Sequence, residues 1–159
     1  MSRSTAASVA IPALDIQSPL VRLGLETDTG ALEVPTDYAL AGWYADGPYP
    51  GQANGPPAVI VGHVDSLTGP AVFFRLREIQ PDTEIHVTRA DGSTAVFRVV
   101  DAQQYPKAAL PDAEVYARRQ PAELVLITCT GQFDDRTGSY LDNFVVTARL
   151  DPEASGVPT

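Results

Sequence analysis

A chain of 159 residues is long enough to form one domain with a sizeable buried core. Its 20 acidic residues against 11 basic ones give a net charge of −9, which argues against nucleic acid and anionic membranes as partners. The single cysteine excludes an internal disulfide and a Cys/His zinc cluster, and the 14 prolines and 12 glycines favour a β-rich domain with many turns.

The first 40 residues predict a leader followed by three short strands. Residues 1–10 are small and polar, without a clear pattern, which is typical of a flexible leader. Residues 11–16 indicate an edge strand, because Pro12 is not tolerated in the centre of a sheet. Apolar alternation predicts a second strand over residues 20–25, and a short third strand follows over residues 32–35.

The middle of the chain contains a second group of strands. Trp43 is expected in the core, and the Gly/Pro/Asn-rich residues 46–57 are expected to form a loop. Residues 58–63, which open with an aliphatic run, predict a second buried strand that ends at His63. After a loop over residues 64–70, residues 71–76 predict a helical turn that packs its apolar side chains on the sheet.

The second half of the chain opens with the clearest local signal. Residues 84–88 and 94–100 predict a hairpin around the turn Asp91-Gly92. Asp112 is suited to cap a short helix over residues 113–118. The remaining segments predict a buried strand over residues 123–129, a loop over residues 130–138, a last strand over residues 144–148 and a polar tail over residues 151–159.

About nine short strands with one or two short helices make the fold mostly β. A closed or nearly closed β-barrel is expected, because closure leaves no exposed strand edge. The predicted organisation is a leader over residues 1–10, one domain over residues 11–150 and the tail over residues 151–159. No apolar stretch is long enough to span a bilayer, and no signal-peptide pattern is visible, so the chain is either cytosolic or an ectodomain without its targeting segment.

Two buried strands end at residues capable of chemistry. The strand over residues 58–63 ends at His63, and the strand over residues 123–129 ends at Cys129, so neighbouring barrel strands would bring both ends to one rim. A cysteine and a histidine are the minimum for thiol nucleophilic catalysis. The alternative is that Cys129 is only a small buried apolar residue. His86 alternates with apolar neighbours in a hairpin strand and is expected to face solvent.

The motifs around both residues resemble those of the sortase family. Leu126-Ile127-Thr128-Cys129 is similar to the sortase nucleophile motif, and Val61-Gly62-His63 is similar to the sortase histidine strand. Further segments over residues 11–150 resemble class F sortases of Gram-positive actinobacteria, in the same order. They are Gly42-Trp43-Tyr44, Pro50-Gly51, Gly62-His63-Val64-Asp65-Ser66, Gly69-Pro70-Ala71-Val72-Phe73 and Ser139-Tyr140-Leu141-Asp142-Asn143.

The resemblance implies a sortase-like closed β-barrel of about eight or nine strands and a monomeric, extracytoplasmic transpeptidase. Such enzymes are held at the cell membrane by an anchor, which would lie outside this chain. They cleave a Leu-Pro-X-Thr-Gly (LPXTG) sorting signal of secreted surface proteins between Thr and Gly. They hold the acyl group as a thioester and transfer it to an amine of a peptidoglycan precursor in the cell wall. No cofactor is implied, and no carboxylate cluster has the spacing of a calcium loop.

The resemblance also assigns the site residues. Cys129 is the nucleophile and His63 the general acid/base, and Thr128 lines the substrate site. The family's third residue is an arginine on the last strand, but alignment of that strand places Asn143 there. Arg136 is the nearest arginine and the candidate for the catalytic cation, although it is also explained as a solvated loop charge.

Asp65, Arg75 and Arg77 complete the candidate residues. Asp65 either orients His63 through a hydrogen bond or shapes the loop after it, where it would line the substrate site together with Asn143. Arg75 and Arg77, downstream of the histidine, are weaker candidates than Arg136 for the catalytic cation.

Two other functions are compatible with the residues. Another cysteine peptidase or an L,D-transpeptidase would also use a thiol, but the usual Ser-His-Gly-Cys pattern of the latter is absent. A catalytically weak or inactive barrel that binds peptides is the other alternative. The missing strand arginine is the feature that favours it.

Overall fold

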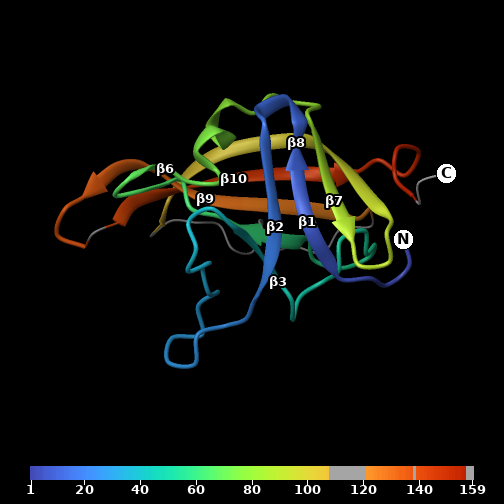
Figure 1. Ribbon diagram of the computed structural model, residues 1–159, viewed down its shortest axis with the longest axis horizontal. Coiled ribbons are helices and arrows are strands. Elements are labelled where there is room, and N and C mark those ends of the chain that lie inside the picture. Colours follow the sequence, from blue (N-terminus) through green and yellow to red (C-terminus); the bar gives the residue numbers. More distant parts are fainter. Residues whose placement is uncertain (108–120, 138, 157–159) are drawn as a thin grey trace.

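Eight strands close into one barrel in the computed structural model of the chain (Figure 1). The structure describes residues 1–107, 121–137 and 139–156, with the backbone alone at 129–132 and 139. The neighbours around the barrel are, in order, β1 (Ala6–Ile11), β2 (Ile16–Leu23), β3 (Ala41–Tyr44), β4 (Ala58–Val61), β9 (Glu123–Asp134), β10 (Ser139–Leu150), β8 (Thr94–Pro106) and β7 (Glu84–Arg89), and β7 pairs with β1. The predicted closed, mostly-β barrel is confirmed.

Short elements complete the described part of the fold. The strands β5 (Asp65–Ser66) and β6 (Gly69–Pro70) form a small hairpin within the segment predicted as loop. The 3-10 helices η1 (Pro12–Leu14) and η2 (Phe74–Glu78) are both brief. The predicted helical turn is confirmed by η2, and the predicted helix over residues 113–118 lies outside the described residues. Across the described ranges, no helix has the length and apolar character needed to cross a membrane.

Apolar side chains form two clusters on opposite faces of the strands. The larger cluster takes residues from all eight barrel strands and fills the barrel; it includes Trp43, which is 3% exposed, as predicted. The smaller cluster comprises Leu23, Val59, Val61, Val125, Ile127 and Val145. Because side chains alternate along a strand, the aliphatic runs of β4 and β9 contribute to both clusters, and both strands are buried on both faces as predicted.

The start of the chain differs from the prediction. Residues 6–10 are not a flexible leader, because they form most of β1 and pair with β2 and β7. Val9 and Ile11 are fully buried, but the small residues around them give a weak alternation. The strand predicted over residues 11–16 is also interrupted, since η1 forms at Pro12, a residue that suits the first turn of a helix.

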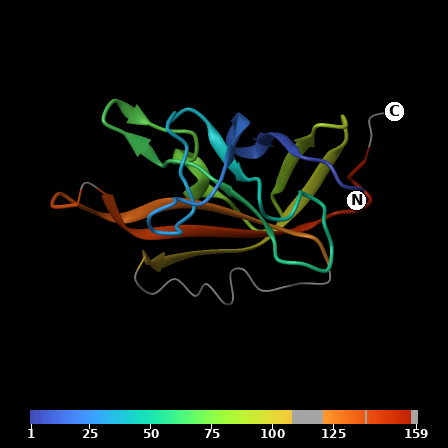
Figure 2. The same cartoon turned by 90° about the horizontal axis from the view of Figure 1, so that it is seen from below.

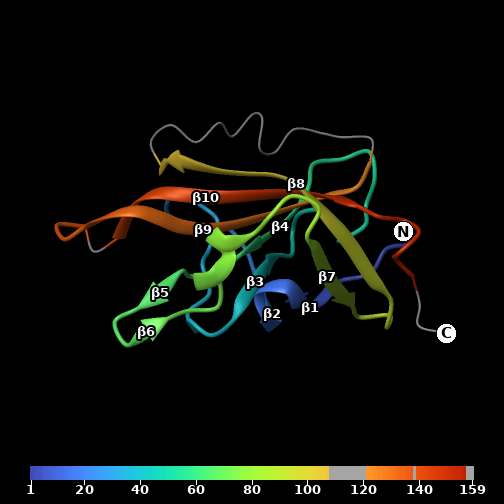
Figure 3. The ribbon, with the colours of Figure 1, turned by 90° about the horizontal axis from the view of Figure 1, so that it is seen from above.

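The strand boundaries near the end of the chain also differ. A loop was predicted over residues 130–138, but β9 continues to Asp134 and β10 begins at Ser139. The two strands form a long hairpin that extends beyond the barrel beside the β5–β6 hairpin (Figures 2 and 3). The sequence did not predict this extension because its residues are mostly polar. An apolar run indicates only the part of a strand that is buried. The strand predicted over residues 32–35 is reduced to one bridge between Leu25 and Leu32.

The hairpin of β7 and β8 confirms the Asp-Gly prediction. Its turn contains Asp91 and Gly92, and Gly92 has φ of 86°, a value that favours glycine. The chain after β10 returns to this hairpin instead of forming a free tail. The N–H of Val96 donates to Ser155 Oγ at 2.8 Å, and Gly156 forms a bridge with Thr94.

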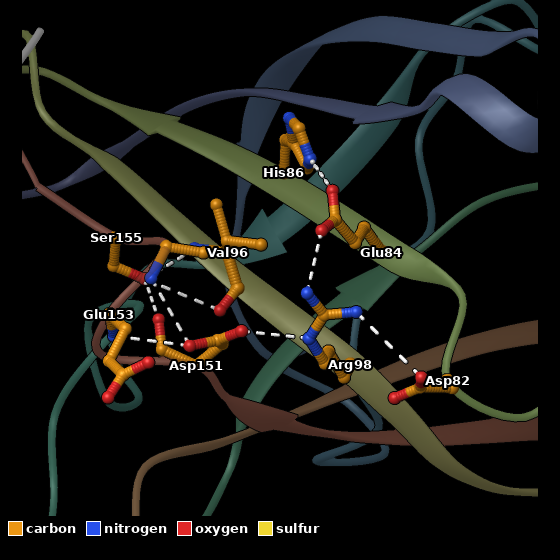
Figure 4. Close-up of polar contacts among 9 residues, drawn as sticks. Asp82, Glu84, His86, Val96, Arg98, Asp151, Glu153 and Ser155 are labelled. Atoms are coloured by element: carbon orange, nitrogen blue, oxygen red, sulfur yellow. Dashed lines mark hydrogen bonds and ion pairs between the residues drawn. The ribbon is translucent and has the colours of Figure 1, made fainter.

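An ion-pair network holds this C-terminal segment to the barrel (Figure 4). Arg98 donates from Nε to Asp151 at 2.8 Å and from Nη2 to Glu84 at 2.9 Å. The hydrogen bond from Arg98 lowers the pKa of Asp151. The hydrogen bond from His86 lowers the pKa of Glu84, with a smaller effect of the Arg98 charge.

We expect the Arg98→Met substitution to lower the melting temperature at pH 7 and to matter less in acid. A carboxylate with a lowered folded-state pKa contributes stability above its usual pKa of about 4, and this is lost as pH falls through the lowered value. Thermal unfolding at pH 7 and pH 3 checks this, with Arg22→Met as an exposed control. A difference from wild type that stays constant across this range would show that packing, not charge, is responsible.

Candidate active site

The register of two parallel strands brings His63 next to Cys129. In the β4–β9 pair, Val61 is the Cα partner of Ile127. The pairing continues past the end of β4, since the N–H of Gly62 donates to the Ile127 carbonyl at 3.2 Å. Two residues after this pair, the two segments reach His63 and Cys129. Both residues therefore lie at the same level of adjacent strands, His63 just past the end of β4 and Cys129 within β9, which continues to Asp134.

The other neighbour of the cysteine strand is β10. Cys129 is the Cα partner of Asn143, and Asn143 is in turn the partner of Tyr105 on β8. The backbone of Cys129 thus lies between the strand that leads to His63 and the strand that carries Asn143. Asn143 therefore lies directly beside Cys129 in the sheet.

A cavity of about 920 Å³ opens over this part of the sheet. Its lining includes residues of the segment that joins β2 to β3 and of the β5–β6 and β9–β10 hairpins. Apolar side chains supply much of its wall. The lining residues include Leu32, Val34, Tyr38, Val61, His63, Asp65, Lys107, Ile127, Thr128, Phe133 and Asn143. Four sequence-predicted site residues therefore share one cavity, namely His63, Asp65, Thr128 and Asn143. The side chain of Cys129 is outside the described set.

His63 is fixed through both its backbone and its ring. The N–H of Phe73 donates to the His63 carbonyl at 3.0 Å. Its ring nitrogen Nε2 lies 2.6 Å from the carbonyl oxygen of Pro35, and the ring of Tyr38 lies against the imidazole with centroids 4.1 Å apart. Gly62 permits this packing, since a Cβ there would lie 2.6 Å from the Phe73 ring.

Asp65 contacts the β9–β10 hairpin. Its Oδ2 accepts a hydrogen bond from the hydroxyl of Tyr140 at 2.5 Å. This contact ties β5 to β10 across the cavity mouth. The sequence left two roles for Asp65, orienting His63 or shaping the loop. The hydrogen bond to Tyr140 agrees with the second role, and the His63 ring contacts the Pro35 carbonyl instead.

Thr128 presents a hydroxyl with no partner inside the described structure. The residue is 4% exposed, lines the cavity, and its Oγ1 makes no hydrogen bond there. A buried hydroxyl left unpaired costs on the order of 1–3 kcal/mol.

The arginines named from the sequence lie away from this cavity. The Arg136 side chain is 90% exposed at the tip of the β9–β10 hairpin, and its Nε lies 3.5 Å from Asp134. Arg75 donates to Glu78 and to the Leu14 carbonyl, and the Arg77 guanidinium lies 4.3 Å from the ring centroid of Phe74.

Lys107 was missed by the sequence analysis. It follows β8 and is the one Lys or Arg among the described residues that line the cavity. Tyr105, two residues before it, lies across β10 from Cys129 through Asn143. No local signal marks this lysine, because its position depends on the β8–β10 register.

His86 lies on β7, which pairs with β1 and β8. Its side chain is one-third exposed and donates a hydrogen bond to Glu84 at 3.0 Å. Within the part of the chain that the structure describes, no three His, Cys, Asp or Glu side chains gather in a way that would hold a metal ion.

Comparison with known proteins gives one family and one fold. Residues 9–151 match the family model described as "Sortase domain". Sortase A of Listeria monocytogenes is 16% identical over 99% of this chain and 92% of its own, with a TM-score of 0.66. A lid mutant of sortase A from Corynebacterium diphtheriae is 22% identical over 97% and 75%, with a TM-score of 0.69. Sortase C of Streptococcus pneumoniae is 18% identical over 100% and 74%, with a TM-score of 0.70. No curated protein sequence matches the chain.

Proposed function

The chain belongs to the sortase family, and from this membership we propose that it is a transpeptidase that cleaves an LPXTG-like sorting signal through a thioester at Cys129. The acyl group is transferred to a cell-wall amine. The observation that carries the proposal is the parallel register that brings His63 and Cys129 to the same level of adjacent strands. Family membership implies a cysteine transpeptidase in general. The sorting signal as substrate and the roles of Cys129 and His63 are what we propose.

The reaction needs two acyl transfers with one proton carrier. The thiolate of Cys129 attacks the scissile Thr carbonyl, and the tetrahedral intermediate collapses to a thioester as the protonated His63 gives its proton to the departing Gly amine. The acceptor amine then attacks the thioester while neutral His63 removes its proton. The Cys129 thiolate leaves, and the enzyme is restored with a new amide bond.

The wall of the cavity suits an apolar peptide with a few hydrogen bonds. Leu32, Val34 and Phe133 offer apolar surface for the Leu and Pro side chains of the signal. The unpartnered hydroxyl of Thr128 and the amide of Asn143 are available to the peptide backbone. These contacts would fix the register of the signal, so that the Thr carbonyl meets the nucleophile.

Class F membership, an extracytoplasmic location and a monomeric state are also part of the proposal. Class F rests on the motifs between residues 42 and 143. A lone unpaired cysteine outside the cell is otherwise a liability, and a catalytic role explains its presence there.

A panel of sorting-signal peptides, each assayed with and without an amine, tests the function. We expect cleavage between Thr and Gly, with an amide product when the amine is present. Hydrolysis alone at every amine concentration would favour a cysteine peptidase. Binding without cleavage of any peptide would favour the inactive peptide-binding barrel.

The third catalytic group is tested by a pair of substitutions. If the third catalytic group is the basic side chain that lines the cavity, Lys107→Met should lower kcat/KM about 100- to 1,000-fold, as expected when a donor to the oxyanion is lost. Arg136→Ala should then stay close to wild type, because its side chain is 90% exposed.

The sequence-based assignment predicts the opposite pattern. If Arg136 supplies the cation, then Arg136→Ala should lose about 100- to 1,000-fold and Arg136→Lys should recover little, because lysine lacks the planar fork of donors. Lys107→Met would then be nearly silent. Alkylation of Cys129 should persist in all the variants, because that step needs only the thiolate.

A further inference from the structure

The ring of His63 is held on two sides by one segment. This strap, residues 32–38, lies between β2 and β3 and lines the same cavity. The carbonyl oxygen of Pro35 lies 2.6 Å from His63 Nε2, and the Tyr38 ring lies over the imidazole with an interplanar angle of 36°. Two residues three positions apart thus constrain both the ring plane and one ring nitrogen.

The contact with Pro35 identifies the protonated nitrogen. A carbonyl oxygen can only accept a hydrogen bond, so Nε2 carries the hydrogen in both the neutral and the charged ring. The other nitrogen, Nδ1, is the one left to exchange a proton with the thiol and the leaving amine. In histidines that transfer protons, the hydrogen bond at one nitrogen sets the role of the other.

The two acidic side chains of the cavity wall are engaged elsewhere. Glu33 Oε1 accepts the N–H of Gly24 at 2.6 Å, and Asp65 accepts the hydroxyl of Tyr140. The orienting partner of His63 is therefore a neutral carbonyl together with an aromatic ring, in the place where a carboxylate often serves. Lys107 is the basic side chain on the same wall.

Tyr38 is itself fixed relative to His63 by the backbone. The Tyr38 carbonyl accepts the N–H of Val72 at 3.1 Å, and the next residue, Phe73, donates its N–H to the His63 carbonyl. Residues 72–73 thus join the strap to the histidine segment. The Tyr38 side chain is half-exposed, so its stacking is a local contact and not part of the barrel core.

We propose that Tyr38 is a positioning residue for His63. Its ring keeps the imidazole in the plane in which Nε2 meets the Pro35 carbonyl and Nδ1 stays available for proton transfer. This role rests on the proposed transpeptidase function, in which His63 carries the proton. Displacement of a catalytic group by about 1 Å costs up to about 100-fold in rate, so a loose ring should slow the chemical step.

The test compares Tyr38→Leu with Tyr38→Phe. Tyr38→Leu removes the stack, and we expect kcat to fall about 10- to 100-fold while KM stays within about twofold. Tyr38→Phe keeps the ring and should retain wild-type kcat. In ¹⁵N NMR of the neutral imidazole, wild type and Tyr38→Phe should show one Nε2–H tautomer, while Tyr38→Leu should show exchange between the two tautomers.

Other outcomes overturn the proposal. A rise in KM with unchanged kcat in Tyr38→Leu would make Tyr38 a substrate-binding wall. An equal loss in Tyr38→Phe would assign the effect to the hydroxyl, and an unchanged tautomer in Tyr38→Leu would exclude a positioning role. If Tyr38→Leu does not fold, as judged by thermal unfolding, Tyr38→Met replaces it as the variant without a ring and should show the same exchange between tautomers. Should no sorting peptide be cleaved by wild type, the proposed function fails, while the NMR comparison still decides the role of Tyr38.

Discussion

Replacement of Cys129 by alanine should abolish cleavage of a sorting-signal peptide while leaving the barrel intact. Only a thiol at this position can form the acyl intermediate, and removal of a catalytic nucleophile typically costs on the order of 10⁶-fold in kcat. Loss of a single sulfur removes little packing. We therefore expect activity at background and a circular dichroism spectrum like that of wild type, measured on the same preparation.

Two controls complete this test. The melting temperature of Cys129→Ala should stay close to that of wild type, which separates loss of chemistry from loss of fold. The variant should also lose its adduct with a thiol alkylator, because the chain has one cysteine. Turnover near the wild-type rate would remove Cys129 from the mechanism.

His63→Ala should be inactive to a similar degree, and His86→Ala should be nearly silent. His63 follows the strand parallel to the cysteine strand and lines the cavity, so under the proposed mechanism its loss removes the group that protonates the leaving amine. His86 lies on β7 and donates to Glu84 on the same strand. These two substitutions are a matched pair, since the described chain places one histidine at the cavity and the other outside it.

The measurement is kcat/KM for both variants with one sorting peptide. A loss of several orders of magnitude is expected for His63→Ala, and a change of less than about twofold for His86→Ala. Equal losses in the two variants would mean that the effect is structural. An active His63→Ala would transfer the general acid/base role to another group.

The barrel could be predicted where burial shaped the sequence. The aliphatic runs of β4 and β9 are apolar at every position because both faces are covered, and the Asp91-Gly92 turn defines its hairpin. β1 was missed because only Val9 and Ile11 among its six residues are fully buried. Its pairing comes from backbone hydrogen bonds, which any sequence can make.

In the candidate site, the positions of His63 and Cys129 could be predicted from the sequence, and those of Lys107 and Tyr38 could not. His63 and Cys129 could be paired because each follows an aliphatic run, and these two runs lie side by side in the sheet, although β9 continues past Cys129 to Asp134. Lys107 and Tyr38 gave no local signal. Their approach to the cavity depends on the β8–β10 register and on the path of the strap between β2 and β3, and both are set by tertiary packing.

Trapping of the acyl-enzyme tests the central claim most directly. Wild-type protein is incubated with a sorting-signal peptide without an amine, quenched in acid, and examined by intact mass and peptide mapping. We predict an adduct with the mass of the acyl fragment ending at Thr, located on the peptide that contains Cys129, released by an added amine and absent in Cys129→Ala. Cleavage of the peptide without any adduct at Cys129, or cleavage that persists in Cys129→Ala, would contradict the account.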